Sequence, residues 1–290
     1  MRDFEFLEPR SVPEASRMLA DLGDDCRVMA GGTALMLAMR QRMLMPTHVV
    51  SAARVEGLRG VVFDPRKGLR IGALTKHAEL ARSEVVRQHY PMLAAMAAQV
   101  ANPQVRNQGT LGGNLCYADP ATDPPGCLLA HGAQVVLGSA RGERVLAIED
   151  FLVDYYVTAL EPDELVVEIR VPAPLPDQAG QYTRFLRTAA EHRPLVNVSL
   201  MTRRDGALCR EARLIVGASV AVPGRVTRAE EFLRGKTVTA AVAAQAADIV
   251  AADIAPISDV RGSGEFRREM VRVVARRTIA GLFGLAGEEA

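Results

Sequence analysis

Apolar residues recur at helical spacing in several stretches of the chain. Over 12–22 they fall on one stripe of a helix, which Ser11 and Glu14 open as a capping box and Gly23 ends. Such a pattern predicts an amphipathic helix with one face against a core. By the same reasoning we predict further helices over 34–43, 74–82, 91–100, 227–235, 239–252 and 264–284.

Short apolar runs bounded by turn residues predict strands between these helices. Residues 68–72 alternate in polarity, and 165–171 are mostly apolar. The other predicted strands are 27–29, 47–51, 133–137, 182–187, 196–202 and 212–219. Residues 102–114, rich in Pro, Asn, Gln and Gly, are predicted as a loop. Prolines around Asp119 and Asp123 argue against a regular helix there.

A proline-rich segment, Pro172-Ala-Pro-Leu-Pro176, divides this pattern in two. Three prolines in five residues can continue neither a strand ladder nor a helix. We therefore predict two α+β modules, a larger one over 1–175 and a smaller one over 176–290. No internal repeat or low-complexity segment interrupts either module.

Charge and composition exclude several classes of function. Lys+Arg number 35 and Asp+Glu 34, so the net charge of +1 supplies no basic field for nucleic acid or anionic lipid. There is no Trp, and aromatic residues make up 4 %, which disfavours a stacking platform for single strands. No apolar run approaches the ~20 residues of a membrane span, and the N-terminus lacks a signal sequence. We expect a cytoplasmic protein that binds no nucleic acid.

The cysteines are few and scattered along the chain. They form no CxxC pair and no cluster with histidine, so they cannot build a local iron–sulfur or zinc site. Buried thiols in a reducing compartment fit this distribution better. We therefore expect no metal site in this chain. The four positions are Cys26, Cys116, Cys127 and Cys209.

Two glycine-rich turns are the strongest candidates for chemistry. The first is Ala30-Gly-Gly-Thr33 and the second is Gly109-Thr-Leu-Gly-Gly-Asn114. Glycine allows a ligand close to the backbone, and successive N–H groups in such turns bind phosphate oxygens. Two such turns suit a diphosphate, one for each phosphate. Neither turn matches GxGxxG or GxxxxGK[ST], and a purely structural turn is the alternative interpretation of each.

The surroundings of the second turn carry a more specific signal. The segment Arg106-Asn-Gln-Gly-Thr-Leu-Gly-Gly-Asn114-Leu-Cys-Tyr-Ala-Asp119-Pro-Ala-Thr-Asp123 resembles the FAD-binding medium subunits of molybdenum hydroxylases, the xanthine dehydrogenase and carbon monoxide dehydrogenase family. The first turn and the segment Asp259-Val-Arg-Gly-Ser-Gly-Glu-Phe-Arg267 are similar to other segments of that family. Ala34 and Phe266 depart from its pattern, where Asp or Ser and Tyr are usual.

The resemblance, which covers nearly the whole chain, implies a fold and a cofactor. The fold is the two-part FAD-binding domain shared with vanillyl-alcohol oxidase and p-cresol methylhydroxylase, over 1–175 with subdomains 1–55 and 56–175. A small α+β C-terminal domain with an antiparallel sheet follows over 176–290. The implied FAD contacts are Met29, Ala30, Gly31, Gly32, Thr33, Ala34, Leu35, Ala101, Thr110, Leu111, Gly112, Gly113, Asn114, Asp123, Val166, Arg184 and His192.

Within this set, the resemblance implies different roles. The two turns hold the diphosphate, Val166 lies near the adenine and Asp123 hydrogen-bonds the cofactor. Arg184 stands where relatives carry Lys near the flavin, and His192 approaches the ring. A positive group there favours reduced flavin, and Arg184, Arg187 and Arg193 are the candidates. No residue of this chain is expected to act as an acid, base or nucleophile, because the flavin carries the redox chemistry.

The implied function is that of one subunit in a larger enzyme. A large subunit with molybdopterin hydroxylates the substrate, and a small subunit carries two [2Fe–2S] clusters. Electrons pass through FAD in this chain to NAD⁺, a quinone or O₂, in a dimer of heterotrimers. Two alternatives stay open: a free-standing FAD-dependent reductase of the same fold, and a scaffold or assembly protein without flavin.

Three further expectations concern residues outside this set. His77 precedes a predicted helical segment and is expected at the surface or as a cap. Asp119 is expected to cap a turn. The methionines at 36, 39, 43 and 45 are expected in the core of a helix.

Overall fold

The computed structural model describes residues 2–285, and within them the chain forms two compact units. The first contains the described residues through Ser83, Asn102–Ala118 and Ala133–Ala173. The second contains Glu84–Ala101, Asp119–Gly132 and the described residues from Pro174 on. The chain therefore passes between the units several times before the proline-rich segment.

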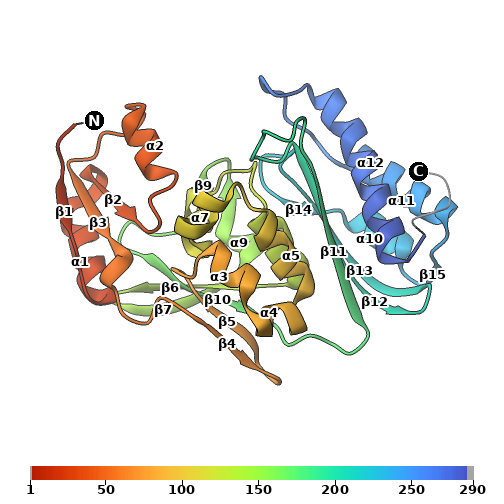
Figure 1. The fold of residues 1–290 in the computed structure, drawn as a ribbon, viewed down its shortest axis with the longest axis horizontal. Helices are drawn as coiled ribbons and strands as arrows, with labels where there is room; N and C mark the ends of the chain where they lie inside the picture. Colours follow the sequence, from red (N-terminus) through yellow and green to blue (C-terminus); the bar gives the residue numbers. More distant parts are fainter. Residues whose placement is uncertain (1, 286–290) are drawn as a thin grey trace. The chain divides into compact units, whose positions relative to one another are not determined.

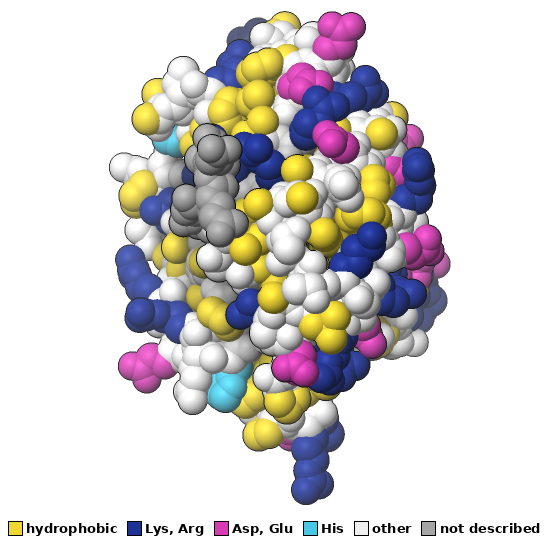
Figure 2. Space-filling view, turned by 90° about the vertical axis from the view of Figure 1, so that its right-hand side faces the viewer, with side chains coloured by type: hydrophobic (Ala, Val, Ile, Leu, Met, Phe, Trp, Pro, Cys, Tyr) yellow, Lys and Arg dark blue, Asp and Glu magenta, His cyan; other side chains and the backbone are white. Residues whose placement is uncertain are grey.

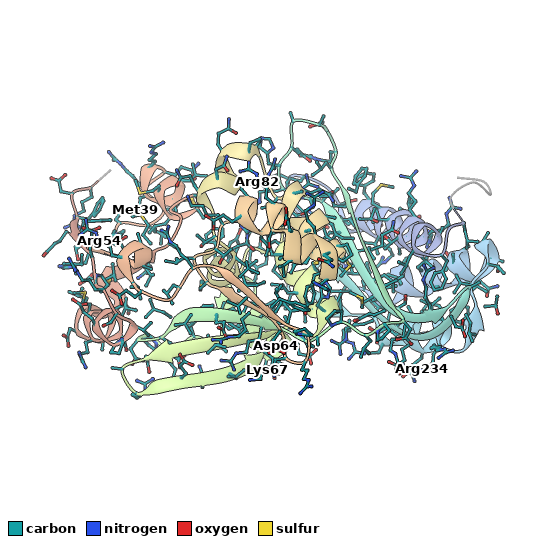
Figure 3. The ribbon with its side chains drawn as sticks, turned by 60° about the horizontal axis from the view of Figure 1, so that its bottom comes forward. Met39, Arg54, Asp64, Lys67, Arg82 and Arg234 are labelled. Carbon is teal, nitrogen blue, oxygen red and sulfur yellow. The ribbon has the colours of Figure 1, made fainter. Side chains whose placement is uncertain are left out.

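The first unit begins with a small parallel sheet. Its strands β1 (Glu5–Leu7), β3 (His48–Ser51) and β2 (Cys26–Met29) lie in that order (Figure 1). Helix α1 (Val12–Leu22) packs its apolar stripe against this sheet, and α2 (Leu35–Arg40) follows β2. Met39 of α2, labelled in Figure 3, is buried. The first glycine turn thus connects a strand to a short helix.

A second, antiparallel sheet completes the first unit. Its order is β4 (Val61–Asp64), β5 (Gly68–Gly72), β10 (Leu165–Val171), β6 (Gln134–Ser139) and β7 (Gly142–Ala147). At the β4–β5 turn, Asp64 Oδ1 accepts the N–H groups of Arg66 and Lys67 at 2.7 and 3.0 Å (Figure 3). The unit also contains η1 (Gly23–Asp25), η2 (Ala52–Arg54), α3 (His77–Arg82), α6 (Pro103–Gln108), α7 (Leu111–Tyr117), α9 (Ile148–Phe151), β8 (Leu152–Asp154) and β9 (Val157–Thr158).

The second unit is built on another antiparallel sheet with helices on both faces. Its strands are β11 (Gln178–Phe185), β12 (Val196–Asp205), β13 (Leu208–Gly217), β14 (Gly224–Arg225) and β15 (Lys236–Thr237). Helices α10 (Thr227–Leu233), α11 (Ala240–Asp253) and α12 (Gly264–Leu282) cover one face (Figure 1). On the other face lie α5 (Pro91–Gln99) and α8 (Pro124–His131); α4 (Glu84–His89) precedes α5.

Strand β12 shows why this sheet needs both layers. Val198 and Leu200 belong to the core under α10–α12, whereas Ser199 lies near Gly126 of α8. Successive side chains of a strand point to opposite faces, so a strand covered on both sides is buried throughout. Residues 196–202 are all buried. The apolar run predicted there as a strand follows from this double burial.

Most predicted elements are present, with three instructive differences. Residues 102–114 are not a loop, because Asn102 caps α6 and Thr110 caps α7. The prediction against a helix near Asp123 was wrong, because Pro124 and Pro125 occupy the first turn of α8, where proline is tolerated. The prediction for the methionines is correct only in part, since Met43 is 73 % exposed after α2 ends at Arg40.

The surface carries charges of both signs. On the face drawn in Figure 2, basic and acidic side chains are interspersed with apolar ones. Among residues 2–285, no helix has the length and apolar content that crossing a membrane requires. Within the same residues, no group of three or more His, Cys, Asp or Glu side chains is arranged to hold a metal ion.

Arg267 is a fully buried charge in the second unit. Its Nη1 donates to the carbonyl oxygens of Leu195 and Ala218 at 3.2 and 3.0 Å. Its Nη2 lies 2.6 Å from Asp259 Oδ1. The guanidinium of Arg267 therefore binds both the connection between β11 and β12 and the segment before α12.

We predict that Arg267→Leu lowers the free energy of unfolding by about 3 kcal/mol or more. The change leaves the two carbonyls without their donor and removes Arg267 from its ion pair with Asp259, and breaking a buried ion pair costs about that much. Urea unfolding measures the difference. Arg277→Leu, at an exposed position of the same helix, is the control and should change stability little. Equal stability of the two variants would contradict the anchoring role.

Candidate functional site

The two glycine turns pack directly against each other within the first unit. A Cβ on Gly31 would lie 2.1 Å from the carbonyl oxygen of Gln108 and 2.9 Å from Gly109 Cα. A Cβ on Gly113 would lie 3.1 Å from the Cβ of Ala30. Because the obstacle at Gly31 is backbone, only glycine permits this approach. Two segments nearly eighty residues apart in sequence therefore form one structure.

The first turn offers a row of backbone donors. Among the described residues, the N–H groups from Gly31 to Leu35 donate to no protein acceptor. Thr33 is exposed, and the other four residues are partly exposed. Gly32 adopts φ +73°, a conformation that glycine favours. Consecutive open amides, together with the exposed Thr33, form the kind of concavity that binds phosphate oxygens.

The second turn differs from the first one. The N–H groups of Leu111, Gly112, Gly113 and Asn114 have acceptors within the protein, so binding of a second phosphate through these amides stays a prediction. Gly112 is glycine because its Cβ would lie 2.6 Å from that of Ala73. The second turn therefore supports the first one. Its bonds are Leu111 N–H to Thr75 O, Gly112 N–H to Ala73 O, Gly113 N–H to Thr110 Oγ1 and Asn114 N–H to Thr110 O, at 2.8–3.1 Å.

His77 lies beside both turns and not at the surface, so that expectation was wrong. It is 2 % exposed, and its N–H donates to Gly109 O at 3.1 Å. A Cβ on Gly109 would lie 3.3 Å from His77 Cδ2 and 3.5 Å from Thr33 Oγ1. Burial, assisted by the charge of Arg106, lowers the pKa of His77 to about 4. The imidazole is therefore neutral at pH 7.

A second set of predicted residues meets inside the second unit. Asp123 is 2 % exposed and accepts a short hydrogen bond from the Tyr182 hydroxyl. Arg184 Nη1 lies 3.3 Å from each oxygen of the same carboxylate. Burial raises the pKa of Asp123 to about 6, although Arg184 and Tyr182 both act against this rise.

The connection between β11 and β12 is also held by charge. Arg193 Nη2 lies 2.6 Å from Asp119 Oδ1, and Asp119 Oδ1 accepts the N–H of Ala121 at 2.9 Å. The prediction that Asp119 caps a turn is therefore confirmed, and its ion pair with Arg193 is an addition. His192 is exposed in this connection, and Ala101 adopts the left-handed φ of +43°.

The predicted site residues thus fall into two groups, one in each unit. The first unit holds 29–35, 110–114 and Val166, and the second holds Ala101, Asp123, Arg184 and His192. Sequence reasoning missed Tyr182, the hydrogen-bond donor to Asp123. A signal was available, because Tyr182 and Arg184 are two residues apart in a predicted strand and therefore share a face.

Two family models account for most of the sequence. Residues 2–174 match the FAD binding domain in molybdopterin dehydrogenase, and residues 181–282 match the CO dehydrogenase flavoprotein C-terminal domain. The open amides of the first turn provide the donors that the diphosphate of such a dinucleotide requires. The chain therefore belongs to the FAD-binding medium subunits of molybdenum hydroxylases, and it is a subunit of an oxidoreductase.

Individual relatives agree with this family over the full length. The chain is 36 % identical over 280 residues to the 6-hydroxypseudooxynicotine dehydrogenase complex subunit alpha of Paenarthrobacter nicotinovorans, covering 96 % of this chain and 93 % of the relative. It is 31 % identical to the carbon monoxide dehydrogenase medium chain of Hydrogenophaga pseudoflava, covering 95 % and 96 %.

Solved structures give the same result for the fold. A chain of the Hydrogenophaga pseudoflava carbon monoxide dehydrogenase superposes with a TM-score of 0.93 at 31 % identity, covering 98 % of both chains. A chain of quinoline 2-oxidoreductase from Pseudomonas putida 86 superposes with a TM-score of 0.92 at 29 % identity, covering 98 % of both. The predicted fold, a two-part FAD-binding domain with a C-terminal α+β domain, is confirmed.

We predict that Gly31→Ala reduces the FAD content of the purified protein at least several-fold. The new Cβ meets the Gln108 carbonyl, so the turns must separate and the row of amides changes its shape. Flavin released by denaturation, measured per mole of protein, reports the loss. The control is Gly224→Ala, where the only neighbour within 4 Å is Val222 O at 3.9 Å. Full FAD content in Gly31→Ala would show that the packing of the turns does not govern binding.

We also predict that acid destabilises the protein partly through His77. The pKa of His77 is about 4 in the folded protein and about 6.5 when unfolded, so the unfolded state binds more protons between these values. Stability due to His77 is complete above pH 6.5 and falls as the pH drops towards 4, by roughly 2 kcal/mol at pH 5.

His77→Gln should therefore make the fall in unfolding free energy between pH 7 and pH 5 shallower. It does not abolish the fall, because burial and Arg213 also lower the pKa of His131 to about 4. Denaturant unfolding at several pH values measures the slope. The exposed His192→Gln variant should keep the wild-type slope, and an identical slope in His77→Gln would contradict the burial of a neutral imidazole.

Proposed function

We propose that this chain holds the FAD through which a molybdenum hydroxylase passes electrons from [2Fe–2S] clusters of a partner subunit to an external acceptor. The observation that carries this proposal is the open row of amides at Gly31–Leu35, held in place by the second glycine turn. The family membership of the whole chain supports the same conclusion.

The residues proposed to bind the cofactor have distinct tasks. Met29–Leu35 take the diphosphate through backbone donors, and Thr110–Asn114 form the wall beside it. Val166, buried on β10, provides an apolar contact for the adenine. The remaining contacts proposed for the flavin side are Ala101, Asp123, Arg184 and His192.

FAD, when bound, supplies the exchange of one or two electrons. The side chains of this chain then have to position it, exclude water and set the local charge. Arg184 is proposed as the positive group near the flavin, with its position fixed by Asp123. No acid, base or nucleophile of this chain takes part in the proposed role.

The proposed assembly contains a large molybdopterin subunit and a small iron–sulfur subunit, arranged as a cytoplasmic dimer of heterotrimers. NAD⁺, a quinone or O₂ accepts the electrons. The proposed domain limits stay at 1–175, with subdomains 1–55 and 56–175, and 176–290. A free-standing reductase is not favoured, because the chain is matched along its whole length by subunits of complexes. A flavin-free scaffold is not favoured either, because the first turn keeps its donors open.

We predict that the protein, isolated from its native host under mild conditions, shows the visible absorption of bound flavin. We further predict that a tag on this chain copurifies a [2Fe–2S] protein and a molybdopterin protein. Absorbance, flavin release and metal analysis measure these properties. Flavin without partners would support the free-standing reductase, whereas partners without flavin would support the scaffold.

A further inference from the structure

Tyr182 is buried and directs its hydroxyl at Asp123, a carboxylate of the second unit that is 2 % exposed. Its side chain comes from the middle of β11, and Arg184 follows on the same face of that strand. Tyr182 donates to Asp123 Oδ1, while Arg184 Nη1 contacts both oxygens at 3.3 Å. The Arg184 side chain is 13 % exposed. The three groups form one buried charge cluster.

Other groups around Asp123 do not replace the charge of Arg184. Cys127 of α8 stays a neutral thiol, because burial and the nearby Asp123 raise its pKa. From β12, the neutral Asn197 donates to Thr122 O at 2.8 Å. Asp119, four residues before Asp123, is already paired with Arg193. The charge state of the cluster therefore depends on Asp123, Tyr182 and Arg184.

We propose that Tyr182 is a positioning residue that keeps Asp123 ionised, and thereby sets how much of the Arg184 charge acts on the flavin. A hydroxyl that donates to a carboxylate stabilises its ionised form. The ionised carboxylate neutralises Arg184, whereas a protonated one leaves the guanidinium charge uncompensated. This inference rests on the proposed function, because it requires the flavin near Arg184.

The cluster gives the flavin potential a pH dependence. Burial has already raised the pKa of Asp123 to about 6, so its carboxylate is mainly ionised at pH 7 and mainly protonated at pH 5. As the pH falls through 6, the uncompensated charge of Arg184 favours the reduced flavin. The midpoint potential should therefore rise more steeply around pH 6 than the flavin's own protonation requires, and return to the flavin's own slope at lower pH, where Asp123 is protonated in both redox states.

The test uses the assembled holoenzyme and a redox titration of its flavin from pH 5 to pH 8. In Tyr182→Phe the lost donor moves the break in the potential to higher pH, so that the midpoint potential at pH 7 is raised. In Asp123→Asn the potential at pH 7 is also raised, and the break near pH 6 is absent. Tyr155→Phe, which removes a hydroxyl from an exposed tyrosine of the first unit, is the matched control and should follow the wild type.

The outcomes separate this inference from the proposed function. A wild-type complex without flavin overturns the proposed function. Flavin-loaded enzyme whose potential has no break near pH 6 overturns the inference alone, even if neither variant folds. The same holds if Tyr182→Phe retains its flavin and follows the wild-type curve. A raised potential in both variants, with the break shifted in one and lost in the other, supports the assigned role.

Discussion

The approach of Gly31 to the carbonyl of Gln108 is the constraint on which the candidate site depends. It joins a turn that follows a parallel strand to a turn between two short helices. The amides of Leu111–Asn114 in the second turn have acceptors within the protein, whereas the first turn packs against it with its own amides open. Open donors are costly unless they reach water or an anion. Partial exposure at this turn satisfies that condition.

In the first unit the candidate site is held by backbone contacts, whereas in the second unit it contains buried charged side chains. Arg267 and Asp123 are both almost inaccessible, yet they act differently. Arg267 donates to two backbone carbonyls, so its charge has a structural role. Burial disfavours the ionised form of Asp123, whereas Arg184 and Tyr182 favour it. The resulting pKa of about 6 lies close to neutral pH. A group with that balance changes its protonation state in response to small changes in its surroundings.

The sequence predicted most of the elements and singled out the two glycine turns as one candidate site, but it did not predict that the turns pack against each other. Residues 68–72 and 165–171 were predicted with the strand limits of the structure, because polarity patterns report burial directly. The amides of Leu111 and Gly112 bond to Ala73 and Thr75, and such tertiary partners leave no local trace. His77 was misjudged for the same reason, since its burial comes from the packing of both turns. The prolines of α8 were misjudged because their meaning depends on where a helix begins.

The relatives help to separate the properties that depend on this chain from those that depend on the rest of the proposed complex. A carbon monoxide dehydrogenase and a quinoline oxidoreductase, named for unlike substrates, contain chains that superpose on this one at TM-scores of 0.93 and 0.92. Features common to such chains concern a common cofactor, because the substrates have little chemistry in common. The glycine contact needs only backbone geometry, so it tolerates wide sequence change elsewhere. Charged residues such as Arg184 are not part of the contact between the glycine turns. Their substitution therefore leaves the proposed diphosphate contacts of the first turn unchanged. Under the proposed function, variation in flavin potential is therefore expected to come from the second unit, whereas the proposed diphosphate contacts belong to the first.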